Sequence, residues 1–178
     1  MQGAMDLDTI QAAIAGQRQA QEALYVHFSP KMFGICLRYA SDYHSAEDIL
    51  QEGFVKVFNN LDRFRGEGSF EGWMKRIFIN TSIEFYRKSI NKRNTVEIDS
   101  VYDQGFDSLA LDRLAAKDLI QVIQKLPTGY RTVFNLYGIE GYTHKEIGKM
   151  LGISEGTSKS QLARARESIQ RMIRDLDK

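Results

Sequence analysis

The segment from Tyr142 to Gln170 constrains the fold more than any other, because it predicts two helices joined by a tight turn. Thr143 is followed three residues later by Glu146, which is the pattern of a capping box at the start of a helix. Gly152 can take the positive φ that reverses the chain at a helix end. Ser154 then predicts the N-cap of a second helix. The segment is therefore predicted to be a helix-turn-helix.

The second helix of this pair has the composition of a helix that lies in the DNA major groove. Apolar residues at helical spacing are predicted to face one another across the pair, at Ile147, Leu151, Ile153, Leu162, Ala165 and Ile169. Basic residues lie along the second helix, at Lys159, Arg164, Arg166 and Arg171. Gly148 is small enough for a close crossing of the two helices. The alternative interpretation is an ordinary αα-hairpin with a solvated basic face.

Composition predicts an all-α protein of one or two domains. The chain has 178 residues, 43% of them hydrophobic and 26% charged, and only two are proline. No run of about 18 apolar residues exists and the N-terminus lacks the pattern of a secretory signal, so we expect a cytoplasmic protein that is not itself a membrane protein. The single cysteine, Cys36, excludes an internal disulfide. The three histidines are scattered, so we expect no metal site and no cofactor.

The net charge of +1 is unevenly distributed. Residues 1–94 carry 12 basic and 11 acidic side chains, whereas residues 95–112 carry no basic and five acidic ones. Residues 113–178 carry 12 basic and seven acidic side chains. A basic C-terminal domain that follows an acidic segment is typical of nucleic-acid-binding proteins.

Hydrophobic periodicity predicts two small helical domains, at residues 1–92 and 110–178, joined by a flexible acidic linker at 93–109. The linker lacks helical periodicity. Ser29 and Pro30 are predicted to bend the chain between two helices. Helices are predicted over residues 7–15, 17–28, 32–40, 45–61, 70–88, 110–126 and 130–139.

The helix predicted at 45–61 is amphipathic, and its polar face carries acidic and amide side chains. No nucleophile, histidine or metal ligand accompanies these carboxylates, so an ionised surface is favoured over acid–base catalysis. Val55 lies within this polar face and suggests that another molecule docks there.

Glycines and aromatic residues alternate with arginines from Leu61 to Lys88. Such a segment suits single-stranded nucleic acid, because unpaired bases stack on rings while cations bind phosphates. Three of its aromatic residues, Trp73, Phe78 and Phe85, are expected in the core. Phe64 and the adjacent glycine loop are the candidates for base binding.

Taken together, these segments resemble the sigma factors of bacterial RNA polymerase, and in particular the extracytoplasmic-function (ECF) group of the sigma-70 family. Four segments carry the resemblance: SAEDILQEGFVKVFNNL (45–61), FRGEGSFEGWMKRIFIN (64–80), LPTGYRTVFNLYGIEGYTHKEIGKMLGIS (126–154) and EGTSKSQLARARESI (155–169). The resemblance implies a non-catalytic transcription initiation factor. Such a factor binds core RNA polymerase, recognises the −10 and −35 promoter elements, and assists strand melting.

The resemblance also implies partners and site residues. The β′ clamp helices of core polymerase would bind Asp48, Gln51, Glu52, Val55 and Asn59. The −10 element, with one flipped base, would be bound by Phe64, Arg65, Phe70, Arg76, Asn80 and Arg87. The −35 element would be bound by Ser154, Gly156, Thr157, Lys159, Ser160, Gln161 and Arg164. Further partners would be the β flap of polymerase and an anti-sigma factor, possibly membrane-bound. The acidic linker would thread toward the RNA exit path.

Three positions depart from the family's pattern in the recognition helix. Ser158 replaces a valine that usually packs there, Gln161 an arginine, and Ala163 a larger side chain. Gln161 would read adenine if its amide faces the groove. Two other functions are kept as alternatives: a dimeric helix-turn-helix regulator that binds DNA without polymerase, and an enzyme that acts on nucleic acid.

Overall fold

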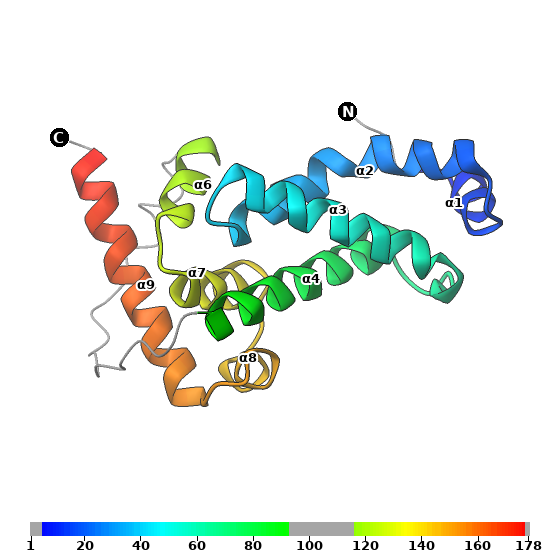
Figure 1. Cartoon of the computed structure of the whole chain (residues 1–178). Coiled ribbons are helices and arrows are strands. Elements are labelled where there is room, and N and C mark those ends of the chain that lie inside the picture. Colours follow the sequence, from blue (N-terminus) through cyan, green and yellow to red (C-terminus); the bar gives the residue numbers. More distant parts are fainter. Residues whose placement is uncertain (1–4, 93–115, 177–178) are drawn as a thin grey trace. The chain divides into compact units, whose positions relative to one another are not determined.

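The computed structural model describes residues 5–92 and 116–176, and every regular element among them is helical. The elements are α1 (Leu7–Ile14), α2 (Arg18–Tyr39), α3 (Tyr43–Asn59), η1 (Leu61–Arg63), α4 (Phe70–Lys92), α6 (Ala116–Gln124), α7 (Thr128–Phe134), η2 (Asn135–Ile139), α8 (His144–Leu151) and α9 (Glu155–Leu176) (Figure 1). The predicted all-α fold is confirmed. In the part of the chain that the structure describes, no helix is long and apolar enough to cross a membrane.

The chain divides into two compact units. The first comprises residues 1–36 and 43–82, and the second comprises residues 37–42 and 83–178. The second unit therefore contains the end of α2 and the end of α4 in addition to helices α6 to α9, which we call the C-terminal module. The predicted linker at 93–109 and the start of the helix predicted from residue 110 lie outside the described residues.

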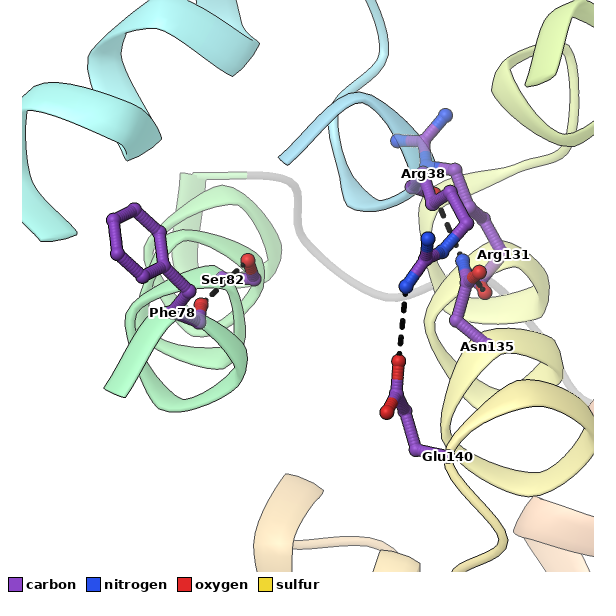
Figure 2. Close-up of polar contacts among 6 residues, drawn as sticks. All are labelled: Arg38, Phe78, Ser82, Arg131, Asn135 and Glu140. Carbon is purple, nitrogen blue, oxygen red and sulfur yellow. Dashed lines mark hydrogen bonds and ion pairs between the residues drawn. The ribbon is translucent and has the colours of Figure 1, made fainter. Parts of the chain in front are cut away.

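The first unit is held together by a close approach of α3 to α4 (Figure 1). A Cβ atom at Gly53 of α3 would lie 2.3 Å from Cε1 of Phe78 in α4. Phe78 is fully buried and its ring packs edge-on against Phe54, with 5.2 Å between ring centroids. One turn later, the buried Ser82 hydroxyl donates to the Phe78 carbonyl at 2.9 Å (Figure 2). Only glycine at position 53 leaves room for this packing.

In the C-terminal module, the long helix α9 packs against α6, α7 and α8. Its inward face supplies Leu162, Ala165 and Ile169, all of them buried. Buried partners come from the other three helices, at Ile123, Val133 and Ile147. The predicted apolar spacing of the helix-turn-helix therefore forms a core.

The predicted bend at Pro30 is wrong, because α2 continues through it from Arg18 to Tyr39. An internal proline removes one backbone hydrogen bond from a helix. Buried apolar side chains continue on both sides of Pro30, with Phe28 before it and Met32 after it. Burial of this continuous face outweighs the lost bond.

Several helix boundaries also differ from the prediction. The helix predicted at 45–61 runs from Tyr43 to Asn59 as α3, and the helix predicted at 70–88 extends to Lys92 as α4. The helix predicted at 130–139 begins at Thr128 and becomes a π-helix from Asn135 to Ile139.

Candidate nucleic-acid interface

Hydrogen bonds at the helix starts fix the helix-turn-helix formed by α8 and α9 (Figure 1). The Glu146 amide donates to the Thr143 hydroxyl at 3.3 Å, and the Thr143 amide donates to the Glu146 carboxylate at 2.8 Å. This confirms the capping box, and the Thr143 amide lowers the pKa of Glu146. Gly152 ends α8 with φ of 71°. The Thr157 amide then donates to the Ser154 hydroxyl at 2.9 Å, which confirms Ser154 as the cap of α9.

The turn between the two helices packs directly onto Gly148 of α8. A Cβ atom at this position would lie 2.9 Å from the Ile153 carbonyl oxygen. Any side chain at position 148 would push the turn away from α8, so it is the turn, rather than a crossing of the two helices, that comes close to this glycine.

The start of α9 exposes small polar and basic side chains at the surface of the C-terminal module. Ser154 and Gly156 are exposed, and the Ser160 hydroxyl donates to the Thr157 carbonyl at 3.0 Å. Lys159 forms an exposed ion pair of 2.7 Å with Glu155. This bond lowers the pKa of Glu155.

Farther along α9, Arg164 lies 3.8 Å from Glu167. Like the Lys159 pair, this ion pair lies within one helix, and its arginine is partly exposed. Such pairs contribute little to stability, so DNA phosphates can compete for both cations.

The side-chain amide of Gln161 is turned toward α7 and does not face outward. A Cβ atom at Gly129 of α7 would lie 3.2 Å from both Nε2 and Oε1 of Gln161. The Oε1 atom is buried and makes no hydrogen bond within the described residues. Gln161 could read adenine only if its amide faced the DNA groove. In this structure the amide faces α7 instead.

Sequence reasoning missed a polar contact between α8 and α9. The fully buried Ser158 hydroxyl lies 2.9 Å from Nδ1 of His144. The His144 ring stacks on Tyr137 at 4.5 Å, and the Arg166 guanidinium lies 5.9 Å from the Tyr137 ring centroid. Burial lowers the pKa of His144, and the nearby cations Lys159 and Arg166 lower it further. A small polar residue at a core position of the recognition helix was the available signal.

In the first unit, the glycine loop before α4 borders a pocket of about 360 Å³. Phe64 and Phe70 line it, and their rings meet edge-on at 5.0 Å. Trp73 adds a third ring 5.7 Å from Phe64. Phe70 is buried and Phe64 is partly exposed. The complete lining is Met5, Leu7, Ile10, His27, Phe28, Lys31, Phe64, Gly66, Gly68, Ser69, Phe70 and Glu71.

Two features of this pocket could not be predicted from the glycine loop alone. Part of the wall comes from α1 and α2, and Lys31 of α2 forms a 2.6 Å ion pair with Glu71 of α4 at the rim. Gly66 and Gly68 have φ of 73° and 82°, so the loop needs glycine at both positions.

The remaining −10 candidates are divided between the two units. Arg65 is exposed in the loop, and Arg76 and Asn80 are exposed one helical turn apart on α4. Arg87 belongs to the second unit, where its guanidinium donates to the Met150 carbonyl of α8. Among the aromatic residues expected in the core, Phe78 is fully buried, whereas Trp73 and Phe85 are partly exposed.

The five polymerase-binding candidates form one exposed stripe on α3. Successive turns of the helix carry Asp48, then Gln51 and Glu52, then Val55 and then Asn59, and all five are exposed. The Val55 side chain is 54% exposed, which is high for an apolar residue surrounded by carboxylates and amides.

Comparisons with known proteins identify the family of this chain. Residues 24–92 match the family model of sigma-70 region 2, and residues 116–169 match that of sigma-70 region 4. The ECF RNA polymerase sigma factor SigW of Bacillus subtilis is 33% identical, over 84% of this chain and 86% of SigW. The chain belongs to the ECF group of the sigma-70 family.

One further relative and one solved structure are similar to this chain. The RNA polymerase sigma-H factor of Pseudomonas aeruginosa is 29% identical over 96% of this chain and 95% of that protein. The fold is similar to that of the sigma factor RpoE of Bartonella quintana, solved with the anti-sigma factor NepR, with a TM-score of 0.50 and 22% identity over 88% of this chain and 98% of that one. This sigma factor is a promoter-specific initiation subunit that works with core RNA polymerase and promoter DNA, and it is not an enzyme.

Proposed function

We propose that the α3 stripe of Asp48, Gln51, Glu52, Val55 and Asn59 binds the β′ clamp helices of core polymerase. Support comes from the uniform exposure of the stripe and from the exposed Val55 within it. An apolar contact ringed by carboxylates and amides is the usual form of a protein interface, with a hydrophobic centre and a polar rim.

The −10 element is proposed to bind the first unit, with one flipped base of the non-template strand in the pocket beside Phe64 and Phe70. A volume of about 360 Å³ is sufficient for a base, and the rings offer stacking surfaces. Arg65, Arg76 and Asn80 would contact the strand outside the pocket. Arg87 is retained as a phosphate contact that exchanges its bond to Met150 for DNA.

The −35 element is proposed to receive the N-terminal part of α9 in its major groove. The capped start of α9, with exposed Lys159 close behind it, is the observation that supports this assignment most directly. The amides near Ser154 and Gly156 would bind phosphate, whereas Lys159, Ser160 and Arg164 would contact the DNA. Thr157 is assigned a supporting role through its bond to the Ser154 hydroxyl.

The functional division is proposed to be residues 1–92, a linker at 93–109, and residues 110–178. The two matched family regions fall within the first and last of these ranges. The β flap of polymerase is a proposed second contact, and an anti-sigma factor is a proposed inhibitor, because the similar RpoE was solved with one. The protein is proposed to act in the cytoplasm with RNA polymerase.

Salt-dependent promoter binding of the reconstituted holoenzyme tests the −35 assignment. Lys159→Ala should weaken binding to every −35 variant about equally and reduce the slope of log affinity against log salt by about 0.9. The matched control is Arg174→Ala, because Arg174 is exposed on the same helix about 22 Å farther along. An equal change of slope in both variants would reject the assignment.

Fluorescence of 2-aminopurine placed in the −10 element tests the base pocket. Capture of the base by the aromatic rings should change its emission when holoenzyme melts the promoter. Phe64→Ala should abolish the change in emission on duplex templates and also on pre-melted templates. Loss on the pre-melted template shows that the variant lacks the base pocket, because no melting step is needed there. The same response in wild type and variant would show that the base binds elsewhere.

A further inference from the structure

Helix α9 begins with a carboxylate at the end that is proposed to approach DNA. Glu155 is the first residue of α9 and directly follows the capping residue Ser154. A carboxylate in the first turn of a helix is stabilised by the positive pole of the helix dipole. One turn later, Lys159 Nζ lies 2.7 Å from Glu155 Oε1, and both side chains are exposed. In the free protein the Glu155 charge is therefore neutralised within α9.

Phosphate binding by Lys159 would take this partner away from Glu155, and this step rests on the proposed function. An exposed ion pair within one helix is weak, so a phosphate can compete for the lysine. Glu155 would then keep its negative charge beside the phosphates of the promoter. Like charges placed together oppose binding. A second cation close to the start of α9 would relieve this repulsion.

His144 of α8 is positioned to supply that cation. Its Nδ1 atom lies 2.9 Å from the buried Ser158 hydroxyl, and its ring stacks on Tyr137 with 4.5 Å between ring centroids and 18° between planes. The start of α9 lies close to α8, because a Cβ atom at Gly148 would lie 3.7 Å from the Glu155 amide nitrogen. All of these residues belong to the second unit. Two contacts therefore hold the imidazole ring near the start of α9.

The charges of His144 and Glu155 act on each other. Burial and the Lys159 charge lower the pKa of His144, whereas the Glu155 charge opposes them. The bond to Lys159 is the main cause of the lowered pKa of Glu155, and the His144 charge contributes to it. Loss of Lys159 to a phosphate would remove an unfavourable charge from the surroundings of the imidazolium and leave a favourable one.

The other charged groups around the ring offer it no alternative partner. Those on η2 and α9, together with its neighbours on α8, are Tyr137, Lys145, Glu146, Glu155, Lys159 and Arg166. The cations among them oppose an imidazolium, and Glu146 already caps its own helix through Thr143. Arg87 of α4 bonds at the opposite end of α8, to the Met150 carbonyl. Among the described groups around the ring, Glu155 is therefore the carboxylate with which an imidazolium can pair.

We infer that Glu155 exchanges Lys159 for His144 as its counter-ion when promoter DNA binds, so that promoter binding takes up a proton at His144. Protonation keeps the existing bond of the ring, because both nitrogens of an imidazolium donate and the Ser158 hydroxyl oxygen can accept from Nδ1. The exchange frees Lys159 for a phosphate without leaving the carboxylate uncompensated.

Proton uptake makes promoter affinity depend on pH. The pKa of His144 is lowered by burial in the free protein and would be higher in the promoter complex, so the complex holds more protons between these two values. Binding is then favoured as pH falls, by at most about tenfold per pH unit for one proton. The affinity should therefore rise as pH falls through the range around the ordinary histidine pKa of about 6.5.

Nuclear magnetic resonance of the free full-length protein tests the exchange without DNA. The Hε1 signal of His144 is identified by its absence in His144→Gln, and its titration gives the pKa. Lys159→Ala mimics the loss of the lysine to a phosphate and should raise this pKa. Adding Glu155→Gln to Lys159→Ala should remove part of the rise. An unchanged pKa in Lys159→Ala would overturn the inference, as would an equal rise in the double variant.

Promoter binding by preformed holoenzyme tests proton uptake. The affinity of the wild type should rise about threefold or more from about pH 7.5 to about pH 6, which lies within the limit for one proton. His144→Gln should lose this rise. Glu155→Gln should lose it too, and near neutral pH it should bind more tightly than the wild type, because no carboxylate remains beside the phosphates. Circular dichroism checks that each variant remains helical at both pH values.

The matched control is His44→Gln, because the His44 side chain is 85% exposed on α3 in the first unit. This variant should keep the pH dependence of the wild type. Absence of a rise in the wild type would overturn the inference, as would a rise that survives in His144→Gln or in Glu155→Gln. If the proposed −35 contact is wrong instead, Lys159→Ala will leave promoter affinity unchanged while the magnetic resonance result stands.

Discussion

The contact of Gly53 with Phe78 predicts that a single methyl group destabilises the first unit. In Gly53→Ala the new Cβ would lie 2.3, 2.6 and 2.8 Å from three atoms of the Phe78 ring, whereas carbon atoms in contact prefer about 3.5–4.0 Å. Overpacking of this kind costs about 1–3 kcal/mol, and so large an overlap places the cost near about 3 kcal/mol. Alanine is favoured over glycine inside a helix by about 1 kcal/mol. The free energy of unfolding should therefore fall by about 2 kcal/mol.

Gly34→Ala provides the matched control. Gly34 lies inside α2, and a Cβ atom there would meet nothing within 4 Å. Only the helix preference applies, so this variant should be more stable by about 1 kcal/mol. Urea unfolding followed by the fluorescence of Trp73, the single tryptophan, reports on the first unit.

A compensating substitution separates steric overlap from other effects of Gly53→Ala. Phe78→Leu shortens the side chain that the methyl group meets. The double variant should be more stable than the sum of the two single effects by about 1 kcal/mol or more. If Gly53→Ala unfolds at the same urea concentration as Gly34→Ala, the close approach of α3 and α4 is refuted.

Three other predictions concern the helix-turn-helix and the proposed polymerase interface. Because the pKa of His144 is lowered on folding, the unfolded chain binds more protons near and below pH 6.5, so stability should fall as pH decreases through this window. His144→Gln, which keeps an acceptor for Ser158, should flatten that fall in urea titrations, and an unchanged pH profile would contradict it. Thr143→Ala should cost about 1 kcal/mol of stability whereas Thr143→Ser should cost little, as measured by thermal unfolding. Val55→Asp should weaken core polymerase binding in fluorescence anisotropy without lowering stability, since Val55 is already exposed.

The helix-turn-helix could be predicted closely because its determinants are local. The bonds at Thr143 and Ser154 join residues three apart, and Gly152 adopts its positive φ within the turn. Each follows from residue type and spacing within a few positions. The exposed stripe on α3 could be predicted for the same reason, since a helix fixes which residues share a face.

The prediction of a bend at Pro30 was wrong because burial of side chains in the tertiary structure keeps α2 continuous there. The expected bend rests on the lost amide donor, but buried side chains extend along α2 before and after the proline. The hydrogen bonds from Arg131 and Asn135 to the end of α2 could not be predicted from the sequence either. Arg131 and Asn135 bond to residues 92 and 97 positions away, and no pattern around them distinguishes a buried donor from an exposed one.

Two of the residues that depart from the family's pattern in α9, Ser158 and Gln161, make contacts inside the C-terminal module. Ser158 is buried and bonds to His144, and the Gln161 amide packs on Gly129. Both residues therefore help to hold α9 on α7 and α8, and their side chains do not add to the exposed surface of α9. In the proposed −35 contact, the sequence preference would then come from side chains that remain at the surface, such as Lys159, together with the shape of the DNA. Replacing Ser158 by valine should consequently alter the stability of the C-terminal module more than its choice of promoter.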